Sequence, residues 1–125
     1  MIKELFMREP IRDRNRLEHM LEAMDNVNEF VQGTTFEGLV GNKMLCHAIV
    51  HNIQVVGEAA YKLTKEFCAL HPEVLWKDIV GLRHVLVHDY YRIDFQELWV
   101  VIHDELPPLR KQIEAILSGV SDTEE

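Results

Sequence analysis

Apolar side chains recur every three to four residues along almost the whole chain of 125 residues, and this helical spacing is the strongest constraint on its fold. The sequence has no stretch in which apolar and polar residues alternate long enough to indicate a convincing β-strand. The spacing predicts helices over about 10–31, 41–69 and 72–88, and a further helix that starts at Asp94. We therefore expect an all-α fold, a bundle of four to five helices.

Several residues indicate where these helices begin and end. Gly33 ends the first helix, and Thr34-Thr35-Phe36-Glu37 resembles a capping box that opens a short helical turn. Pro72 suits the first turn of the third helix. Asp94 is the clearest start signal, because a glutamate follows three residues later. Pro107-Pro108 must kink or split the last helix, since proline cannot donate the interior hydrogen bond.

The second predicted helix is apolar on two sides. One face carries Leu45, Ile49, Asn52, Val56, Ala60, Leu63 and Phe67, and a neighbouring strip carries Met44, Ala48, Val55 and Ala59. Such a helix needs two neighbours, either within the fold or across a dimer interface. Gly57, with Ala59 and Ala60, leaves a smooth patch where another helix can approach closely. The carboxylate of Glu58 beside it must be paired or face a cleft, and Arg83 is a natural partner.

Length and composition predict one domain over 1–117 with a polar, frayed tail over 118–125. No apolar run approaches the length of a membrane span, and the N-terminus lacks a signal-peptide core, so we expect a cytoplasmic protein without a membrane partner. Cys46 and Cys68 fall within helical patterns and are expected to be buried free thiols. The net charge of −8 opposes a general nucleic-acid surface, so RNA chemistry would need a local basic pocket or a partner that supplies positive charge.

The segment Gly81–Tyr90 carries the residues best suited to chemistry. Arg83 can hold a phosphate through its planar set of donors, and His88 can move a proton near neutral pH. Together they suffice to cleave a phosphodiester without a metal. On a straight helix the two residues lie about 140° apart, so they converge only if the helix ends or distorts near His88, or if two copies of the chain meet. A dimer with its site between the subunits is the more attractive solution.

Taken one residue at a time, structural roles are favoured over catalytic ones. Arg83 can form a surface salt bridge, and His88 can face the negative end of the helix dipole. His47 and His51, like His84 and His88, have the spacing of two metal ligands, but neither pair has an obvious third ligand, and we expect no metal site.

The segment Arg83-His84-x3-His88 resembles the Arg-polar-x3-His motif of the HEPN superfamily, and the chain is similar to its HepT-type toxins. These toxins belong to the HEPN/MNT toxin–antitoxin modules, in which MNT is a minimal nucleotidyltransferase. The supporting features extend over roughly 10–117: Arg16, Glu18-His19-Met20, Val56-Gly57-Glu58-Ala59-Ala60, His71-Pro72-Glu73-x2-Trp76, Gly81-Leu82-Arg83-x4-His88-Asp89-Tyr90, Ile93-Asp94, Leu98-Trp99 and Leu106-Pro107-x-Leu109.

The resemblance implies a HEPN-like homodimer that acts as a metal-independent endoribonuclease without a cofactor. By analogy, His88 serves as general base or acid at the ribose 2′-OH and the leaving oxygen, and Arg83 stabilises the phosphorane-like transition state. His84 stands where the family commonly has Asn, and with Glu58 it is assigned a supporting role. A partner nucleotidyltransferase, the antitoxin, would silence the enzyme by attaching AMP to Tyr90, in a complex that can be larger than the dimer.

Two other hypotheses remain open. In the first, the chain is a non-catalytic helical dimer that binds a nucleotidyltransferase or a nucleotide. In the second, it is a structural bundle in which Arg83 and His88 are helix-end salt-bridge residues.

Overall fold

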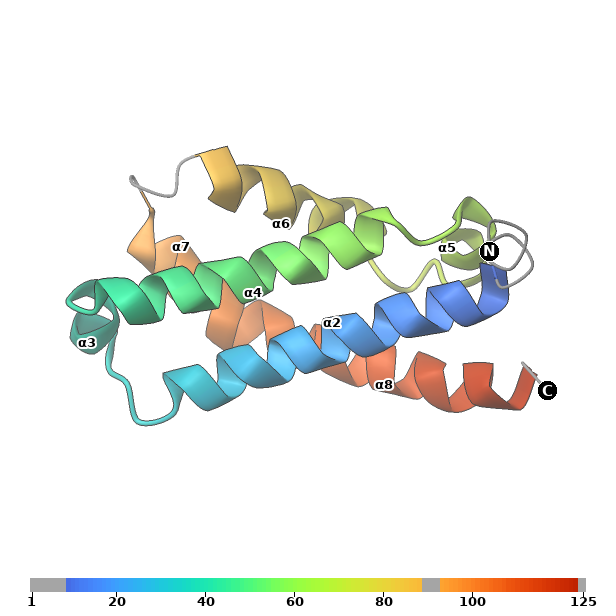
Figure 1. The fold of residues 1–125 in the computed structure, drawn as a ribbon, viewed down its shortest axis with the longest axis horizontal. Helices are drawn as coiled ribbons and strands as arrows, with labels where there is room; N and C mark the ends of the chain where they lie inside the picture. Colours follow the sequence, from blue (N-terminus) through green and yellow to red (C-terminus); the bar gives the residue numbers. More distant parts are fainter. Residues whose placement is uncertain (1–8, 89–92, 124–125) are drawn as a thin grey trace, which may run out of the picture.

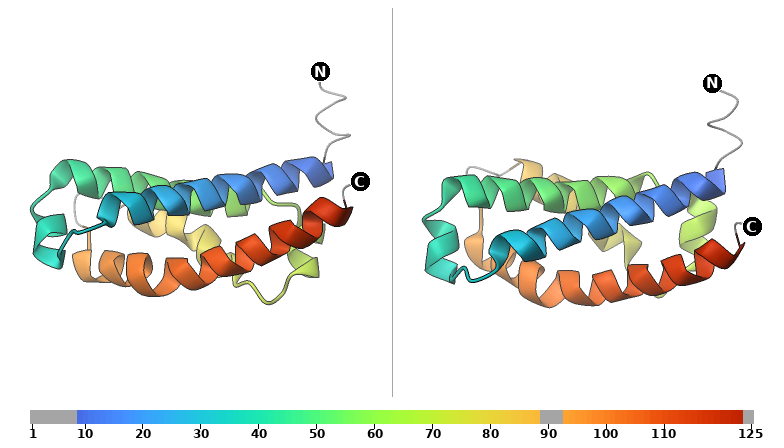
Figure 2. Two further views of the ribbon diagram at one scale, coloured as in Figure 1. Left: turned by 90° about the horizontal axis from the view of Figure 1, so that it is seen from below. Right: turned by 60° about the horizontal axis from the view of Figure 1, so that its bottom comes forward.

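The computed structural model describes residues 9–88 and 93–123, with side chains described for 12–83 and 93–119. All its elements in these ranges are helical: α2 (Glu9–Val31), α3 (Phe36–Val40), α4 (Lys43–Tyr61), α5 (Lys65–Leu70), α6 (Trp76–His88), α7 (Phe95–Val100), the π-helical turn η2 (Val101–Glu105) and α8 (Leu106–Thr123). α2, α4, α6 and the continuous α7–η2–α8 rod form the body, and α3 and α5 are short connections (Figures 1 and 2). The predicted all-α bundle of four to five helices is confirmed.

The centre of the fold is α4, which packs against α2 on one side and α6 on the other (Figure 1). Both neighbours that its two apolar faces require are therefore present within one chain. The strip that faces them differs in part from the predicted one, since Cys46, Val50, Ile53 and Gly57 are buried whereas Met44 is 82% exposed. Asn52, the polar residue on the buried face, accepts a hydrogen bond from Asn26 of α2 and donates one to the carbonyl of Ala48.

The hydrophobic core lies between α2, α4 and the α7–η2–α8 rod. Its most completely buried side chains are Leu17, Met20, Val27, Leu39, Ile49, Ile53, Val56, Leu98 and Ile113. Except for Leu39 and Ile53, they lie on the apolar stripes that helical spacing predicts for the first, second and last helices. On the outside, an ion pair joins Arg110 of α8 to Asp25 of α2, with Nε 2.6 Å from Oδ1.

The helix predicted over 41–69 is in fact two helices, α4 and α5, so that prediction was wrong. Thr64 caps α5 by accepting a hydrogen bond from the backbone N–H of Phe67. The buried carboxylate of Asp13 in α2 accepts two more bonds, from the backbone N–H and the hydroxyl of Thr64, at 2.9 and 2.7 Å. This long-range anchor turns the chain at a position where local spacing predicts continued helix.

The third helix also begins later than predicted, at Trp76 rather than near Pro72. Val74 is buried, and the indole N–H of Trp76 donates to the carbonyl of His71 at 2.9 Å, which holds the intervening residues in a turn. A helix over 72–88 would place Leu75 on its buried side together with Ile79, Leu82 and Leu86, but Leu75 is instead 68% exposed.

In the second half of the chain, the residues expected to start and interrupt the last helix do so in the structure. Asp94 caps α7 through a hydrogen bond from the N–H of Glu97, as predicted. The interruption expected at Pro107-Pro108 takes the form of the η2 turn, which widens the helix immediately before the two prolines. α8 then continues to Thr123, into the segment where we expected a frayed tail.

Three smaller expectations can also be assessed. Gly33 ends α2 in the left-handed region, with φ of 72°, as its position suggests. Thr35 rather than Thr34 caps α3, so the predicted capping box does not form. None of the helices in the described ranges is long and apolar enough to cross a membrane.

Candidate functional site

Gly57 determines how closely α6 approaches α4. A Cβ atom at Gly57 would lie 2.8 Å from the backbone nitrogen of Arg83, and 3.1 Å from both Arg83 Cβ and the carbonyl oxygen of Ile79. Only a hydrogen atom fits between the two helices here, which confirms the smooth patch expected from the sequence. The close crossing brings the backbone of Arg83 directly over α4.

From this crossing, the Arg83 side chain extends over two residues of the last turns of α4. Its Nη1 donates to Glu58 Oε1 at 2.8 Å, and its Cζ lies 3.6 Å from the centroid of the Tyr61 ring. The predicted pairing of Glu58 with Arg83 is confirmed. Since the guanidinium is fixed from two directions, its position is defined before any ligand arrives.

The charges of this cluster affect one another. The hydrogen bond from Arg83 lowers the pKa of the Glu58 carboxyl, and the same bond raises the pKa of Arg83. Lys62 approaches the other Glu58 oxygen, Oε2, at 3.6 Å. Two cations thus share one carboxylate, which leaves a net positive charge at this point of a chain whose total is −8.

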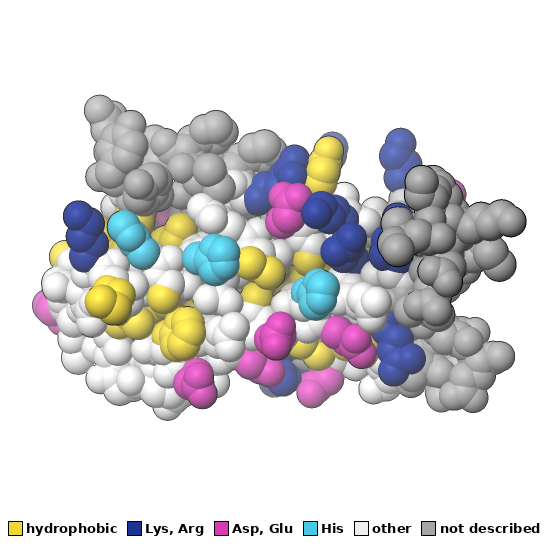
Figure 3. All heavy atoms as spheres, in the orientation of Figure 1, with side chains coloured by type: hydrophobic (Ala, Val, Ile, Leu, Met, Phe, Trp, Pro, Cys, Tyr) yellow, Lys and Arg dark blue, Asp and Glu magenta, His cyan; other side chains and the backbone are white. Residues whose placement is uncertain are grey.

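The same face of the molecule collects other basic side chains. Figure 3 shows dark blue Lys and Arg atoms gathered around the C-terminal half of α4 and the neighbouring part of α2, with magenta carboxylate atoms among them, whereas further magenta carboxylates lie along the lower edge. A local basic region, which RNA chemistry on an acidic chain would require, is therefore present beside Arg83.

The remaining predicted site residues are only partly placed. The backbone of His84 and His88 belongs to α6, but their side chains, like the whole of Tyr90, lie outside the described part of the structure. Because α6 is helical from Trp76 to His88, the Cα positions of Arg83 and His88 are about 140° apart around its axis. Their convergence stays a prediction.

Tyr61 is the component of the site that our sequence analysis missed. It follows Glu58 by three residues on the same helix, and residues at this spacing share a helix face. Once Arg83 was assigned to Glu58, an aromatic residue one turn further on could have been recognised as a second partner.

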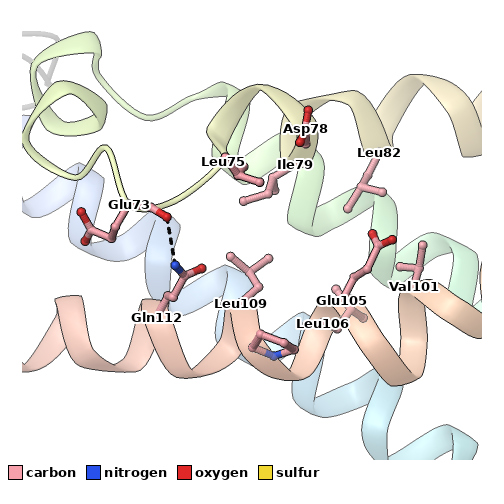
Figure 4. Close-up of a pocket in the computed structure, with 11 residues that line it drawn as sticks. Glu73, Leu75, Asp78, Ile79, Leu82, Val101, Glu105, Leu106, Leu109 and Gln112 are labelled. Atoms are coloured by element: carbon pink, nitrogen blue, oxygen red, sulfur yellow. Dashed lines mark hydrogen bonds between the residues drawn. The ribbon is translucent and has the colours of Figure 1, made fainter.

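A separate cavity of about 420 Å³ lies between α6 and the η2–α8 segment (Figure 4). Leu75, Ile79 and Leu82 point into it from α6 and its preceding turn, and Val101, Leu106 and Leu109 line the opposite side. Glu73, Asp78 and Glu105 place carboxylates around it. Of the predicted site residues whose side chains the structure describes, neither Glu58 nor Arg83 lines this cavity.

The histidine pair His47 and His51 lines a shallow hollow together with Val50 and Gln54. Within the residues that the structure describes, no group of three or more His, Cys, Asp or Glu side chains is arranged to hold a metal ion. Cys46 is buried and Cys68 half-buried, both are free thiols, and burial raises the pKa of each.

Comparison with known proteins identifies the family. The family model described as "Ribonuclease HepT-like" matches residues 20–116. The chain belongs to this family. That membership confirms the resemblance to HepT-type proteins of the HEPN superfamily.

Relatives of the HepT-like family cover most of the chain. A protein of Caldanaerobacter subterraneus subsp. tengcongensis named "Putative RNase" is 38% identical over 83% of this chain and 93% of its own length. A "Putative RNase" of Methanocaldococcus jannaschii is 32% identical over 78% of this chain and 89% of its own length. A "Probable ribonuclease HepT" of Thermococcus cleftensis is 28% identical over 82% of this chain and 94% of its own length. No solved structure matches the chain at a significant level.

Proposed function

We propose that this HepT-like protein is a metal-independent endoribonuclease, the toxin of a HEPN/MNT toxin–antitoxin module. The observation that carries the proposal is the Arg83 guanidinium, which Glu58 and Tyr61 fix on the basic face of an otherwise acidic chain. The family to which the chain belongs and the names of its relatives point to ribonuclease chemistry.

The proposed reaction is an attack of a ribose 2′-oxygen on the neighbouring phosphorus. The 2′-O–P bond forms, the P–O5′ bond breaks, and the products are a 2′,3′-cyclic phosphate and a 5′-hydroxyl. His88 accepts the proton of the 2′-OH or returns one to the leaving 5′-oxygen. Arg83 stabilises the additional negative charge on the phosphorane-like transition state.

We further propose that the active unit is a homodimer. Arg83 and His88 of one chain lie on different sides of α6, so they do not meet on a straight helix. A second copy of the chain, related by a symmetry axis, can bring its own His88 to the first copy's Arg83. A dimer would also supply two imidazoles, one as base and one as acid, and would double the local positive charge.

The antitoxin in this proposal is an MNT-type nucleotidyltransferase that attaches AMP to Tyr90. Tyr90 lies seven residues after Arg83, a spacing that returns to nearly the same side of a helix. The phosphate of an attached AMP would occupy the Arg83 guanidinium and neutralise its charge. Such a modification would block the RNA phosphate from the same donors.

The test is cleavage of single-stranded RNA by the purified protein in excess chelator, with intact-mass measurement to confirm that Tyr90 is unmodified. We expect cleavage with 2′,3′-cyclic phosphate ends, its loss in His88→Ala and Arg83→Ala, and full activity in His19→Ala, a control at an exposed histidine of α2. Activity that needs added divalent metal, or that survives His88→Ala, would refute these roles.

The alternative function is a non-catalytic helical dimer that binds a nucleotidyltransferase or a nucleotide. It is favoured by the Glu58 carboxylate, which already occupies one end of the Arg83 guanidinium, and by the net charge of −8. An unmodified, folded protein that binds such a partner but cuts no RNA under any metal condition would establish this alternative.

A further inference from the structure

Tyr61 has two properties that its role as a neighbour of Arg83 does not require. The residue is 56% exposed although the Arg83 guanidinium lies 3.6 Å from its ring centroid. A tyrosine that is exposed over more than half of its residue surface, with a guanidinium against one face of its ring, offers aromatic surface to solvent beside the charged site. Exposed aromatic faces next to a fixed cation are the elements from which single-stranded nucleic-acid sites are built.

We propose that Tyr61 is a nucleobase-stacking platform. A base of single-stranded RNA stacks on the open face of the Tyr61 ring, while the adjoining phosphate takes the guanidinium edge of Arg83 that Glu58 leaves unoccupied. This assignment deepens the proposed ribonuclease function and rests on it, since it names the group that holds the substrate nucleotide beside the reacting phosphate.

The surroundings of Tyr61 suit a nucleotide in both charge and geometry. Lys62, the next residue, has a side chain that is 48% exposed, and its Nζ lies 3.6 Å from Glu58 Oε2. Its ammonium group is therefore available to a second phosphate. The Arg83 side chain is 21% exposed, and its Nε is buried without a hydrogen-bond partner among the described residues, so this proposal assigns the phosphate to the terminal Nη atoms. Three groups suited to a nucleotide are thus neighbours here: the Arg83 guanidinium on α6, the Tyr61 ring at the end of α4, and the Lys62 ammonium one residue further on.

Stacking of this kind predicts little preference among the four bases. Every base presents a π-face, and stacking on an aromatic side chain does not depend on hydrogen-bond patterns. The platform therefore predicts recognition of unpaired RNA rather than of a sequence, because a base inside a duplex already has its faces covered. The competing explanation is that Tyr61 serves only to hold Arg83 in place.

The experiment measures binding with and without bases. The ligands are a 2′-O-methyl hexaribonucleotide, which lacks the attacking hydroxyl and cannot be cut by the proposed reaction, and a fully abasic hexamer with the same phosphates. Fluorescence anisotropy gives Kd for the parent, Tyr61→Phe and Tyr61→Leu. Phe30→Leu is the matched control, since Phe30 is 37% exposed at the other end of the bundle (Figure 1). Circular dichroism melts verify that each variant is folded.

We expect Tyr61→Leu to raise Kd for the base-containing hexamer by about five- to 150-fold, the range for loss of one stacked base. Tyr61→Phe and Phe30→Leu should stay within about twofold of the parent. On the abasic hexamer, Tyr61→Leu should lose clearly less affinity than on the base-containing hexamer, because only the contact that helps to hold Arg83 is removed there. Equal binding of parent and Tyr61→Leu to the base-containing hexamer would overturn the platform, and so would a loss of the same size on the abasic hexamer.

Cleavage of unmodified RNA, measured on the same samples, separates this inference from the proposed function. A parent protein that cuts no RNA but shows the base-dependent effect of Tyr61→Leu would refute the nuclease and keep the nucleobase site. A parent protein that cuts RNA while Tyr61→Leu binds both hexamers as the parent does would refute only the platform.

Discussion

Replacement of Gly57 by alanine should loosen the junction on which the candidate site is built. The added Cβ would lie 2.8 Å from the backbone nitrogen of Arg83, and real Cβ atoms essentially never approach a neighbour this closely. The atoms in the way belong to the α6 backbone at Arg83 and Ile79 rather than to a flexible side-chain end, so the helix itself must shift away from α4. The expected displacement is therefore at the residue that carries the guanidinium.

Two opposing terms decide the size of the effect. Alanine stabilises a helix interior by about 1 kcal/mol relative to glycine. Overpacking of a closely fitted contact costs about 1–3 kcal/mol, and contact with rigid backbone favours the upper part of that range. We therefore expect Gly57→Ala to lower the free energy of unfolding by about 1–2 kcal/mol.

Gly81→Ala is the matched control, because Gly81 lies in α6 and a Cβ there meets no atom within 4 Å. Both substitutions make the same helix-propensity change, so the difference between their urea-unfolding free energies isolates the steric cost at Gly57. We expect Gly81→Ala to be as stable as the parent or up to about 1 kcal/mol more stable. If Gly57→Ala proved as stable as Gly81→Ala, the close crossing of α4 and α6 would be refuted.

Further predictions concern the ion pair, the long-range anchor and the shifted start of α6. Because Arg83 lowers the pKa of Glu58 in the folded state, the ion pair contributes stability that is complete above the unfolded pKa of about 4.3 and is lost as pH falls through the lower folded pKa. The difference in unfolding free energy between the parent and Glu58→Gln should therefore be constant from pH 7 to about 5 and shrink in acid. A difference that stays unchanged in acid would contradict the pairing. Asp13→Ala should cost about 1–3 kcal/mol in urea unfolding, since it removes both bonds to Thr64, whereas Asp25→Ala at the exposed pair with Arg110 should cost less than about 1 kcal/mol; equal costs would argue against the anchor. Ile79→Ala should cost about 2–5 kcal/mol and Leu75→Ala less than about 0.5 kcal/mol, and the reverse order would favour a helix that begins near Pro72.

The parts of the fold that the sequence predicted are those governed by local spacing and capping. The first helix with its apolar stripe of Leu17, Met20, Met24 and Val27, the Asp94 cap and the interruption at Pro107-Pro108 depend on neighbouring residues only, and the structure has all three. The Glu58–Arg83 pair was also predictable, because a carboxylate in an apolar segment requires a cation.

The errors have long-range causes. The end of α4 depends on Asp13, which lies 51 residues before Thr64 in the sequence and reaches it only in the folded chain. The late start of α6 depends on the buried Val74 and on the indole of Trp76, which bonds back to His71. Local periodicity over 41–69 and 72–88 contains no information about either partner. Tyr61 lies outside the apolar stripes, so periodicity did not single it out; only the prior assignment of Arg83 to Glu58, three residues earlier on the same helix, could have indicated its contact with the guanidinium.

The arrangement of α4 explains how an acidic chain can present a site for a polyanion. Glycine at position 57 admits the α6 backbone, and Glu58 and Tyr61 then fix Arg83 from a carboxylate and a ring face, both on the same helix. A lone surface arginine on a chain of net charge −8 would be attracted by many carboxylates and would hold no defined position. The carboxylate of Glu58 weakens the local positive field, but a fixed guanidinium loses less freedom when a phosphate binds, and Lys62 offsets part of the lost charge. Removal of Glu58 should therefore strengthen non-specific RNA binding and at the same time leave the Arg83 guanidinium less well positioned. If Glu58 only cancelled positive charge, its removal would strengthen binding without any loss of position at Arg83.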